Sequence, residues 1–469
     1  MLSRVPRALI DNYDELLVHA HRASTEEHLA RKTIERSLLF RGRPVCNVLR
    51  PFFMTSALYA QVMRAATLVA RGLTVVARRL AKDAAFRELL ALTPEEEALV
   101  QLDPGEPTEL LGRLDGFIGA DGVIRFVEYN PVPAGVIETE ELCETFAEMP
   151  IMRTLSQRHP MRSVPRTRHL IGEALRSTHA RKGGKGCPNV AVLHAQRDPN
   201  GHGTDGKSSD AQPSEDSLLG IPEMIKVLDA LIENGVTIRM LDPAEMRVEA
   251  GRLCAGDFSI DAVLIADWPS FLRTVPADAP FWGAIRSGGA WIINSAATAI
   301  VRGSKSVFTI LSDPAHAHLF DPEVTEALAR HVPWTRRVRA GKTSFEDRTV
   351  DLIPFIAEAR ERLVLKPADQ YGGKDVVLGW ETDEESFRRA LKRAIAEPYV
   401  VQERVTSPWE DYPDAMSGEL RFQTRISDVN PFIWNDEWAH GCSVRLSTSA
   451  ITNVSAGVGS QTPIFLVDA

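Results

Sequence analysis

The stretch that most constrains the fold is residues 113–131, which read RLDGFIGADGVIRFVEYNP. Two β-rich runs flank the Asp121-Gly122 dipeptide. This dipeptide predicts a two-residue type I′ turn, because both central residues of that turn need positive φ. Counting outward from the turn places two residue pairs directly across the hairpin: Asp115 with Glu128, and Arg113 with Asn130.

The paired side chains indicate a cation site. Directly opposed Cβ atoms lie only ~5 Å apart, and like charges there are destabilising. Carboxylates and an amide carbonyl are oxygen ligands that suit Mg²⁺, which commonly binds one or two protein carboxylates together with nucleotide phosphates. Arg113 would then be free to bind an anion. The alternative interpretation is an ordinary amphipathic hairpin with a solvated charged face.

Length and composition limit the number of domains, the classes of partner and the cellular compartment that we expect. A chain of 469 residues is too long for one hydrophobic core, so we expect two or three domains or subdomains. The formal net charge of −9 argues against non-specific electrostatic binding of nucleic acid. No apolar run reaches the ~18 residues of a membrane span, and the N-terminus lacks the apolar core of a secretory signal. Five scattered cysteines without a C-x-x-C pair favour a reduced, cytoplasmic protein.

The first part of the chain, to about residue 100, carries helical periodicity, most clearly over residues 57–81. Gly and Pro interrupt it at residues 41–51. A further helix is predicted to begin at residues 93–96, which read TPEE, with Thr93 as the cap and a Glu three residues later. After the hairpin, another helix is expected near Thr139.

From Cys187 onward, short apolar runs alternate with helical stretches, which predicts a mostly parallel sheet. Its expected strands are residues 190–193, 236–241, 260–265 and 290–294, with a helix at 221–234. Residues 197–217, rich in Gly, Asp, Ser and Lys, are predicted to be a flexible surface loop. The C-terminal part alternates polar and apolar residues at 420–426 and 442–446, which predicts antiparallel strands.

A second stretch whose residues suggest a binding role is residues 362–376, RLVLKPADQYGGKDV. Lys366 ends a predicted buried strand, and Gly372 and Gly373 follow in a loop whose amides can approach an anion. Taken singly, Lys366 could be a surface lysine and the glycine pair a simple turn. A predicted helix at 384–396 and a strand at 399–403, which ends in Gln402-Glu403, complete the unit.

These motifs together resemble the ATP-grasp ligases. In that family an R-x-D strand, a hairpin and E-x-N form the magnesium site on ATP, and the strand lysine, glycine loop and Q-E segment form the lid and nucleotide hinge. The resemblance implies the following assignments: Asp115, Glu128 and Asn130 as metal ligands, Arg113 as the clamp for an acyl phosphate, and Lys305, Lys366, Gly372, Gly373, Gln402 and Glu403 as nucleotide-binding residues. Arg445 resembles an arginine of the substrate-facing part, although a structural ion pair is an equal alternative for it.

The order of the motifs resembles the circularly permuted branch of the family, which includes glutathionylspermidine synthetase, because the acids precede the lysines. The implied fold is α/β (α+β): an ATP-grasp fold with a helical N-terminal region and a parallel-sheet domain. The expected division is 1–110 helical region, 111–160 hairpin with the metal ligands, 161–304 parallel-sheet domain, 305–412 lid and hinge, and 413–469 C-terminal strands of the core.

The implied function is an ATP-dependent carboxylate-amine ligase that acts through an acyl phosphate and uses ATP and Mg²⁺. Its partners would be a small-molecule or peptide carboxylate and an amine. Two alternatives stay open. One is a kinase that uses the same ATP site to phosphorylate a hydroxyl, and the other is a non-catalytic ATP-binding protein.

Overall fold

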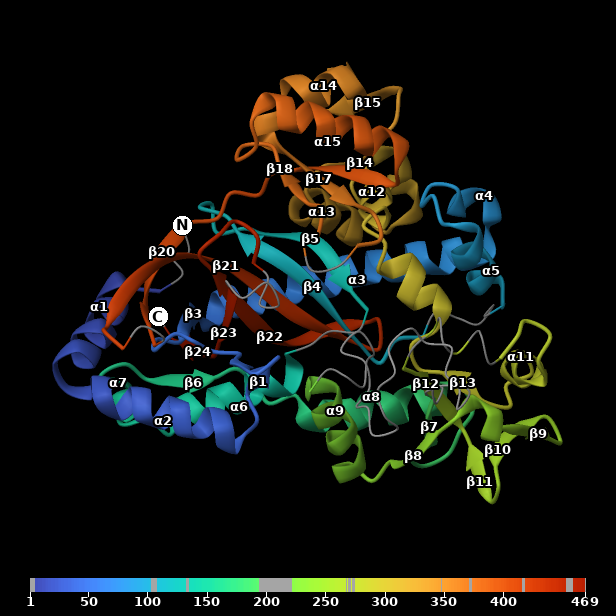
Figure 1. The fold of residues 1–469 in the computed structure, drawn as a ribbon, viewed down its shortest axis with the longest axis horizontal. Helices are drawn as coiled ribbons and strands as arrows, with labels where there is room; N and C mark the ends of the chain where they lie inside the picture. Colours follow the sequence, from blue (N-terminus) through green and yellow to red (C-terminus); the bar gives the residue numbers. More distant parts are fainter. Residues whose placement is uncertain are drawn as a thin grey trace, which may run out of the picture.

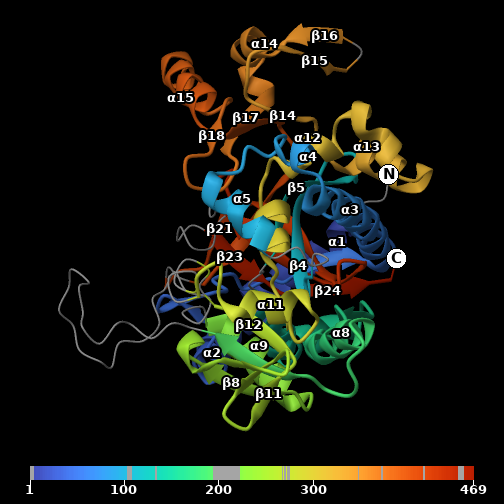
Figure 2. The same cartoon turned by 90° about the vertical axis from the view of Figure 1, so that its right-hand side faces the viewer.

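The computed structural model describes residues 5–102, 108–131, 135–193, 222–266, 268, 271, 275–346, 348–370, 373–415, 418–452 and 459–468. Three groups of elements are stacked along the vertical direction of Figures 1 and 2. A central antiparallel sheet lies in the middle, a smaller sheet with its helices lies above it, and a parallel sheet lies below. No helix among the described residues combines the length and the apolar character that a membrane crossing requires.

The predicted hairpin forms from β4 (Leu111–Ile118) and β5 (Ile124–Asn130). Asp115 pairs with Glu128 and Arg113 with Asn130, so the predicted register at these residues is confirmed. The predicted turn is wrong. The Gly119 N–H donates to the Val123 carbonyl at 2.9 Å, which leaves a three-residue loop in which only Gly122 has positive φ, 76°.

The longer loop and a β-bulge compensate for each other. Near the turn Phe117 pairs with Arg125, one position away from the predicted register. Between that part and the Asp115–Glu128 pair the register shifts, with Val127 as the extra residue of β5. A bulge of this kind inserts one residue into one strand only. The site residues therefore return to the pairing that a two-residue turn would have produced.

The central sheet has the strand order β23-β22-β21-β4-β5, and β20 pairs with β21. Neighbouring strands are antiparallel, which confirms the C-terminal strands expected from the alternating pattern. Their bounds are β20 (Trp409–Asp414), β21 (Arg421–Trp434), β22 (Trp438–Ser447) and β23 (Gly459–Thr462). The sheet thus joins a hairpin near residue 120 to strands beyond residue 400.

The longest helix, α3 (Ser56–Lys82), packs against the central sheet and confirms the helical periodicity of this region. It begins where the Thr55 hydroxyl accepts a hydrogen bond from the Leu58 N–H, an N-cap of the usual kind. Other N-terminal helices are α1 (Arg7–Leu16), α2 (Arg22–Glu35), α4 (Ala84–Arg87) and α5 (Pro94–Leu102). The predicted cap of α5 is confirmed, because Thr93 and Glu96 exchange backbone and side-chain hydrogen bonds.

A short sheet ties the N-terminal helices to the C-terminal strands. Its order is β3-β24-β6, with β3 (Phe52–Thr55) parallel to β24 (Ile464–Val467) and β6 (Met161–Ser163) antiparallel. Helices α6 (Val136–Ala147) and α7 (Pro150–Ser156) follow the hairpin, and α6 is the helix expected near Thr139. The side chains of these elements join one large hydrophobic cluster with α3.

The predicted parallel sheet is confirmed, with the order β13-β12-β7-β8. Its strands are β7 (Asn189–Leu193), β8 (Thr237–Leu241), β12 (Ala262–Ile265) and β13 (Trp291–Ile292). The accompanying helices are α8 (Arg168–Arg181), α9 (Pro222–Glu233) and α11 (Pro280–Arg286), and a small meander is formed by β9 (Arg247–Glu249), β10 (Arg252–Ala255) and β11 (Phe258–Ile260). The predicted loop at 197–217 lies outside the described residues.

The upper sheet, which we call the lid sheet, has the order β14-β19-β17-β18. Its strands are β14 (Thr335–Arg337), β17 (Leu363–Pro367), β18 (Val377–Leu378) and β19 (Tyr399–Glu403). Helices α12 (Val307–Leu311), α13 (Pro322–His331), α14 (Leu352–Glu358) and α15 (Glu384–Ala396) belong to the same part of the chain, with the hairpin β15 (Lys342–Phe345) and β16 (Arg348–Asp351). The strands and helix predicted around Lys366 are therefore present.

Candidate active site

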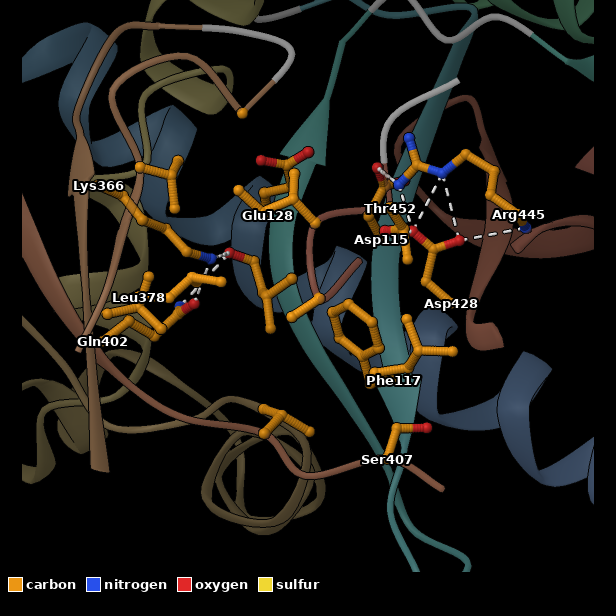
Figure 3. A pocket seen from close by; sticks show the side chains of 18 of the residues that line it. Asp115, Phe117, Glu128, Lys366, Leu378, Gln402, Ser407, Asp428, Arg445 and Thr452 are labelled. Carbon is orange, nitrogen blue, oxygen red and sulfur yellow. Dashed lines mark hydrogen bonds and ion pairs between the residues drawn. The ribbon is translucent and has the colours of Figure 1, made fainter. Parts of the chain in front are cut away.

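A cavity of about 860 Å³ is lined by residues of the lid sheet and of the central sheet. All of the predicted site residues that the structure describes line this one cavity: Arg113, Asp115, Glu128, Asn130, Lys305, Lys366, Gly373, Gln402, Glu403 and Arg445. Gly372 lies outside the described residues. Figure 3 shows Lys366 and Gln402 on one side, Asp115, Asp428 and Arg445 on the other, and Glu128 between them. Asp115 and Arg445, which are 330 positions apart in the sequence, therefore meet at one site.

Asp115 lies at the centre of a buried charge cluster. Its carboxylate accepts from Arg113 Nε at 2.6 Å and Nη2 at 3.0 Å, and from Arg445 Nη2 at 2.8 Å. Burial alone would raise the pKa of Asp115, but the two guanidinium charges outweigh it and hold this pKa at about 2. Arg113 is therefore engaged with Asp115 in this structure, and its binding of an anion when a cation occupies the site stays a prediction.

Arg445 is held from two sides. Its Nη2 also donates to Asp428 at 2.5 Å, and Asp428 lies opposite Arg445 in the β21–β22 register. The Thr452 hydroxyl donates to the same carboxylate. The ion-pair alternative for Arg445 is thus realised. The sequence interpretation missed Asp428 and Thr452, because nothing in the local pattern fixed how β21 and β22 pair.

Glu128 and Asn130 present a different environment on the next strand. Glu128 is partly exposed to the cavity, and its Oε2 lies 3.5 Å from Lys305 Nζ. Asn130 Nδ2 lies 3.0 Å from Asp115 Oδ2 and 3.5 Å from Glu128 Oε1. Lys305 Nζ also donates to the Gln370 carbonyl at 2.6 Å. Lys305, two residues before α12, therefore lies beside the acid that faces the cavity.

Lys366 contacts both the lid sheet and the hairpin. Its Nζ donates to Gln402 Oε1 at 2.7 Å and lies 3.5 Å from the carbonyl oxygen of Val127, the bulge residue. Gln402 Nε2 donates to the hydroxyl of Thr335 at 3.0 Å and contacts the same carbonyl at 3.4 Å. Burial lowers the pKa of Lys366 to about 8, although Glu128 acts in the opposite direction.

Gly373 occupies a position where a side chain does not fit well. Its φ is 73°, and a Cβ at this residue would lie 2.8 Å from Ile451 Cγ2. Glu403, at the end of β19, accepts from Arg362 Nη2 at 3.2 Å and is partly exposed. The glycine loop and the end of β19 therefore border the cavity with the residue types that the sequence indicated.

The oxygen donors of the hairpin fit a divalent cation that also contacts a phosphate. Asp115 stays ionised, and Glu128 and Asn130 line the same cavity. Because both oxygens of Asp115 already accept from guanidinium groups, Glu128 and Asn130 are the ligands most accessible from the cavity. Within the described residues, no group of three or more His, Cys, Asp or Glu side chains is arranged to hold a metal ion. Ligands from a nucleotide would be needed, as is usual for Mg²⁺.

No protein-family model matches this sequence, and no curated protein sequence matches it. Among solved structures, a glutathione synthetase-like effector (GSS30) from Globodera pallida, in its apo form, aligns with a TM-score of 0.61 and 14% sequence identity over 95% of this chain and 96% of the effector.

Two further matches have lower TM-scores. A putative γ-glutamylcysteine synthetase from Methylobacillus flagellatus KT aligns at 0.39 with 10% identity, covering 84% of this chain and 88% of that one. D-alanyl-alanine synthetase A from Vibrio cholerae O1 aligns at 0.23 with 13% identity, covering 52% and 68%. The first match extends over nearly the whole of both chains, and the mixed α/β architecture is consistent with an ATP-grasp-like fold.

Proposed function

We propose that this chain is an ATP-dependent carboxylate-amine ligase with a circularly permuted ATP-grasp fold. One observation carries the proposal. The cavity between the lid sheet and the central sheet brings the cationic side chains of Lys305 and Lys366 to face Glu128 and Asp115. Such a pairing of phosphate-binding cations with metal-binding oxygens suits a bound nucleotide triphosphate.

The permuted order is supported by the chain path. The hairpin with the acids is complete by Asn130, and the lid lysine follows only at Lys366 in β17. Neither segment pairs with the other in a sheet, yet Lys366 Nζ approaches the Val127 carbonyl oxygen. Acids that precede the lysines along the chain are what the circularly permuted branch would have, and this order supports the proposal.

The reaction we propose has two steps. A carboxylate oxygen of the first substrate bonds to the γ-phosphorus of ATP, and ADP leaves. The amine of the second substrate then attacks the acyl carbon, phosphate leaves with the C–O bond electrons, and the amine loses a proton. Phosphoryl transfer of this kind depends on positioning and charge stabilisation, and no covalent protein nucleophile is required.

In this scheme Lys366 and Lys305 hold phosphate oxygens, and Gly373 closes the cavity against water that would hydrolyse the acyl phosphate. Gln402 and Glu403 line the nucleotide. Arg113 and Arg445 stabilise negative charge at the reacting carboxylate. In this role each guanidinium donates hydrogen bonds to Asp115 and to the substrate at the same time. Glu128, Asn130 and Asp115 would hold Mg²⁺, which supplies charge neutralisation at the phosphate oxygens when bound.

The test is release of ADP and phosphate from the full chain with MgATP across pooled amino acids, peptides and polyamines, with mass spectrometry of each positive pool. A product lighter than the summed substrates by one water supports the ligase. ADP release with a product heavier by a phosphate group replaces the proposal with a kinase. Nucleotide binding without turnover in every pool favours a non-catalytic ATP-binding protein.

A further inference from the structure

One end of the same cavity is lined by three polar residues that the ATP chemistry does not use. They are Glu138 of α6, Glu223 of α9 and Gln461 of β23. All three are more than nine-tenths buried. They come from the helix after the hairpin, the parallel-sheet part and the central sheet, so the fold brings together three separate segments here.

Glu223 has a structural role that accounts for part of its burial. Its Oε1 accepts from the Ile137 N–H at 2.6 Å and its Oε2 from the Glu138 N–H at 3.2 Å. A carboxylate at this position satisfies backbone donors of the first turn of α6 that have no partner within the helix. This capping of α6 by Glu223 does not require a second acid beside it. Both carboxylate oxygens of Glu223 also keep further lone pairs that can accept hydrogen bonds.

Glu138 and Gln461 are not explained by the cap. Glu138 Oε2 accepts from Gln461 Nε2 at 2.8 Å, which fixes the amide orientation of Gln461. The other amide atom, Gln461 Oε1, is buried and has no hydrogen-bond partner among the described residues. Such an unsatisfied buried acceptor costs about 1–3 kcal/mol unless a ligand or water satisfies it. Gln461 is also a lining residue of the cavity, so a donor group on a ligand bound at this end would satisfy the amide oxygen.

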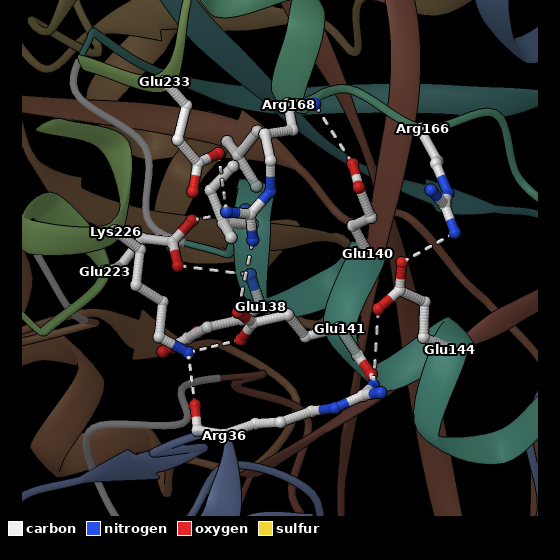
Figure 4. A network of polar contacts seen from close by, with 12 residues as sticks. Arg36, Glu138, Glu140, Glu141, Glu144, Arg166, Arg168, Glu223, Lys226 and Glu233 are labelled. Atoms are coloured by element: carbon white, nitrogen blue, oxygen red, sulfur yellow. Dashed lines mark hydrogen bonds and ion pairs between the residues drawn. The ribbon is translucent and has the colours of Figure 1, made fainter. Parts of the chain in front are cut away.

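The charges around the acid pair do not neutralise it. Lys226, one turn after Glu223 in α9, donates to Glu141 Oε2 at 2.5 Å and to the Arg36 carbonyl at 2.9 Å (Figure 4). Burial raises the pKa of Glu138 and that of Glu223, and their mutual repulsion adds to the shift of Glu223. Lys226 lowers both pKa values and Glu141 raises that of Glu138, but neither change returns the pair to ordinary acidity.

We propose that Glu138, Glu223 and Gln461 form a subsite for a primary ammonium group of a substrate. A primary ammonium has three N–H donors and no acceptor, and the subsite offers two carboxyl groups and one unsatisfied amide oxygen. The proposal deepens the proposed function and rests on it for the statement that the ligand is a substrate. Two sources share this chemistry: the free amino group of an amino-acid or peptide carboxylate, and the distal amino group of a diamine nucleophile.

The subsite has a distinctive proton linkage. A bound cation favours the ionised carboxylates, so the pKa values of the acids fall on binding and protons are released. Affinity for the ammonium therefore rises with pH while the acids titrate, until the ligand's own amine loses its charge. A purely structural acid pair would show neither effect.

The experiment is isothermal titration calorimetry on the full chain with 1,4-diaminobutane and glycylglycine, each with and without MgATP. The matched ligands 1-aminobutane and N-acetylglycylglycine lack the second amine and the free ammonium, respectively. Titrations in two buffers of different ionisation enthalpy measure the released protons. Binding of the diamine above 1-aminobutane assigns the ammonium to the nucleophile. Binding of the dipeptide above its acetylated form assigns it to the carboxylate substrate.

The variants are Glu138→Gln and Gln461→Met, both of similar size to the native residues. We expect each to raise Kd for the binding probe at least tenfold, and Glu138→Gln to reduce the proton release. The control is Glu140→Gln, because Glu140 is also buried and caps α8 through the N–H groups of Thr167 and Arg168 but does not line the cavity. Thermal unfolding identifies any variant that fails to fold.

Absence of binding for every probe, or wild-type affinity in both folded variants, overturns the subsite. MgATP binding is measured on the same preparations and separates the two proposals. If the protein binds no MgATP but loses ammonium binding on Glu138→Gln, the subsite stands and the ligase falls.

Discussion

Asp115 and Glu128 face each other at one register position of the β4–β5 hairpin, yet their carboxylates have different partners. Asp115 is buried and accepts from two arginines, whereas Glu128 is partly exposed to the cavity beside Lys305. Asp115 therefore holds the two arginines in place, whereas Glu128 is the more accessible of the two acids from the cavity. The two residues should therefore respond differently to substitution.

Glu128→Ala is expected to abolish turnover and to leave the fold largely intact. The change removes a proposed metal ligand whose side chain is partly exposed, and Lys305 keeps its hydrogen bond to the Gln370 carbonyl. ADP release and thermal unfolding are the measurements. Asp121→Ala, at the hairpin turn, is the control that should keep activity. Wild-type-like activity in Glu128→Ala would contradict the metal assignment.

Asp115→Ala is expected to lower the free energy of unfolding by about 3–5 kcal/mol, because it leaves Arg113 and Arg445 buried without this partner. Denaturant unfolding measures the change. The matched control is again Asp121→Ala, which breaks an exposed pair with Arg125 and should cost less than about 1 kcal/mol. Equal costs for the two variants would show that the buried cluster contributes no more than a surface pair.

MgATP affinity is expected to fall as pH rises above about 8. Lys366 has a pKa of about 8 in the free protein, and phosphate oxygens favour its charged form, so the pKa of the bound state is higher. Between the pKa of Lys366 in the free protein and its higher pKa in the complex, the Kd for MgATP increases by up to about tenfold per pH unit. Below pH 8 the protonation of Lys366 does not affect this Kd. Calorimetry across this range measures the profile. Lys366→Met should bind more weakly with a flat profile, and an unchanged slope in this variant would assign the titration elsewhere.

Gly373→Ala is expected to destabilise the glycine loop and to weaken ATP binding. Its φ of 73° is unfavourable for alanine by about 1–2 kcal/mol, and the added Cβ would also press on Ile451. Gly418→Ala is the matched control, since its φ is 68° and no atom lies within 4 Å of the added carbon. Both variants should lose stability, but only Gly373→Ala should raise KM for ATP. An equal effect on KM would remove Gly373 from the nucleotide site.

Local sequence patterns predicted the elements of the site well, because they depend on short-range chemistry. The cap at Thr93, the periodicity of α3 and the strand ending at Lys366 are all set by neighbours in the sequence. The Asp115–Glu128 pairing was predicted with the wrong turn, because Asp121-Gly122 also suits a three-residue loop in which only the glycine needs positive φ. The bulge that restores the register has no local sequence signal.

Long-range pairing was beyond the sequence interpretation. Asp428 meets Arg445 through the β21–β22 register, and Glu223 meets α6 through the packing of two helices that are distant in the chain. Neither residue belongs to a motif, and each has an ordinary neighbourhood in sequence. The roles of the candidate residues in binding and catalysis, and the division of the chain into domains, stay predictions.

The bulge at Val127 has a consequence for mutagenesis of this site. The group that Lys366 and Gln402 approach on the hairpin is a main-chain carbonyl, which every amino acid carries. Alanine at this position would leave the carbonyl in place, so an alanine scan of the cavity would not report whether this contact orients the lid lysine. Its contribution is therefore accessible only to backbone chemistry, such as an amide-to-ester replacement, or to deletion of the extra residue.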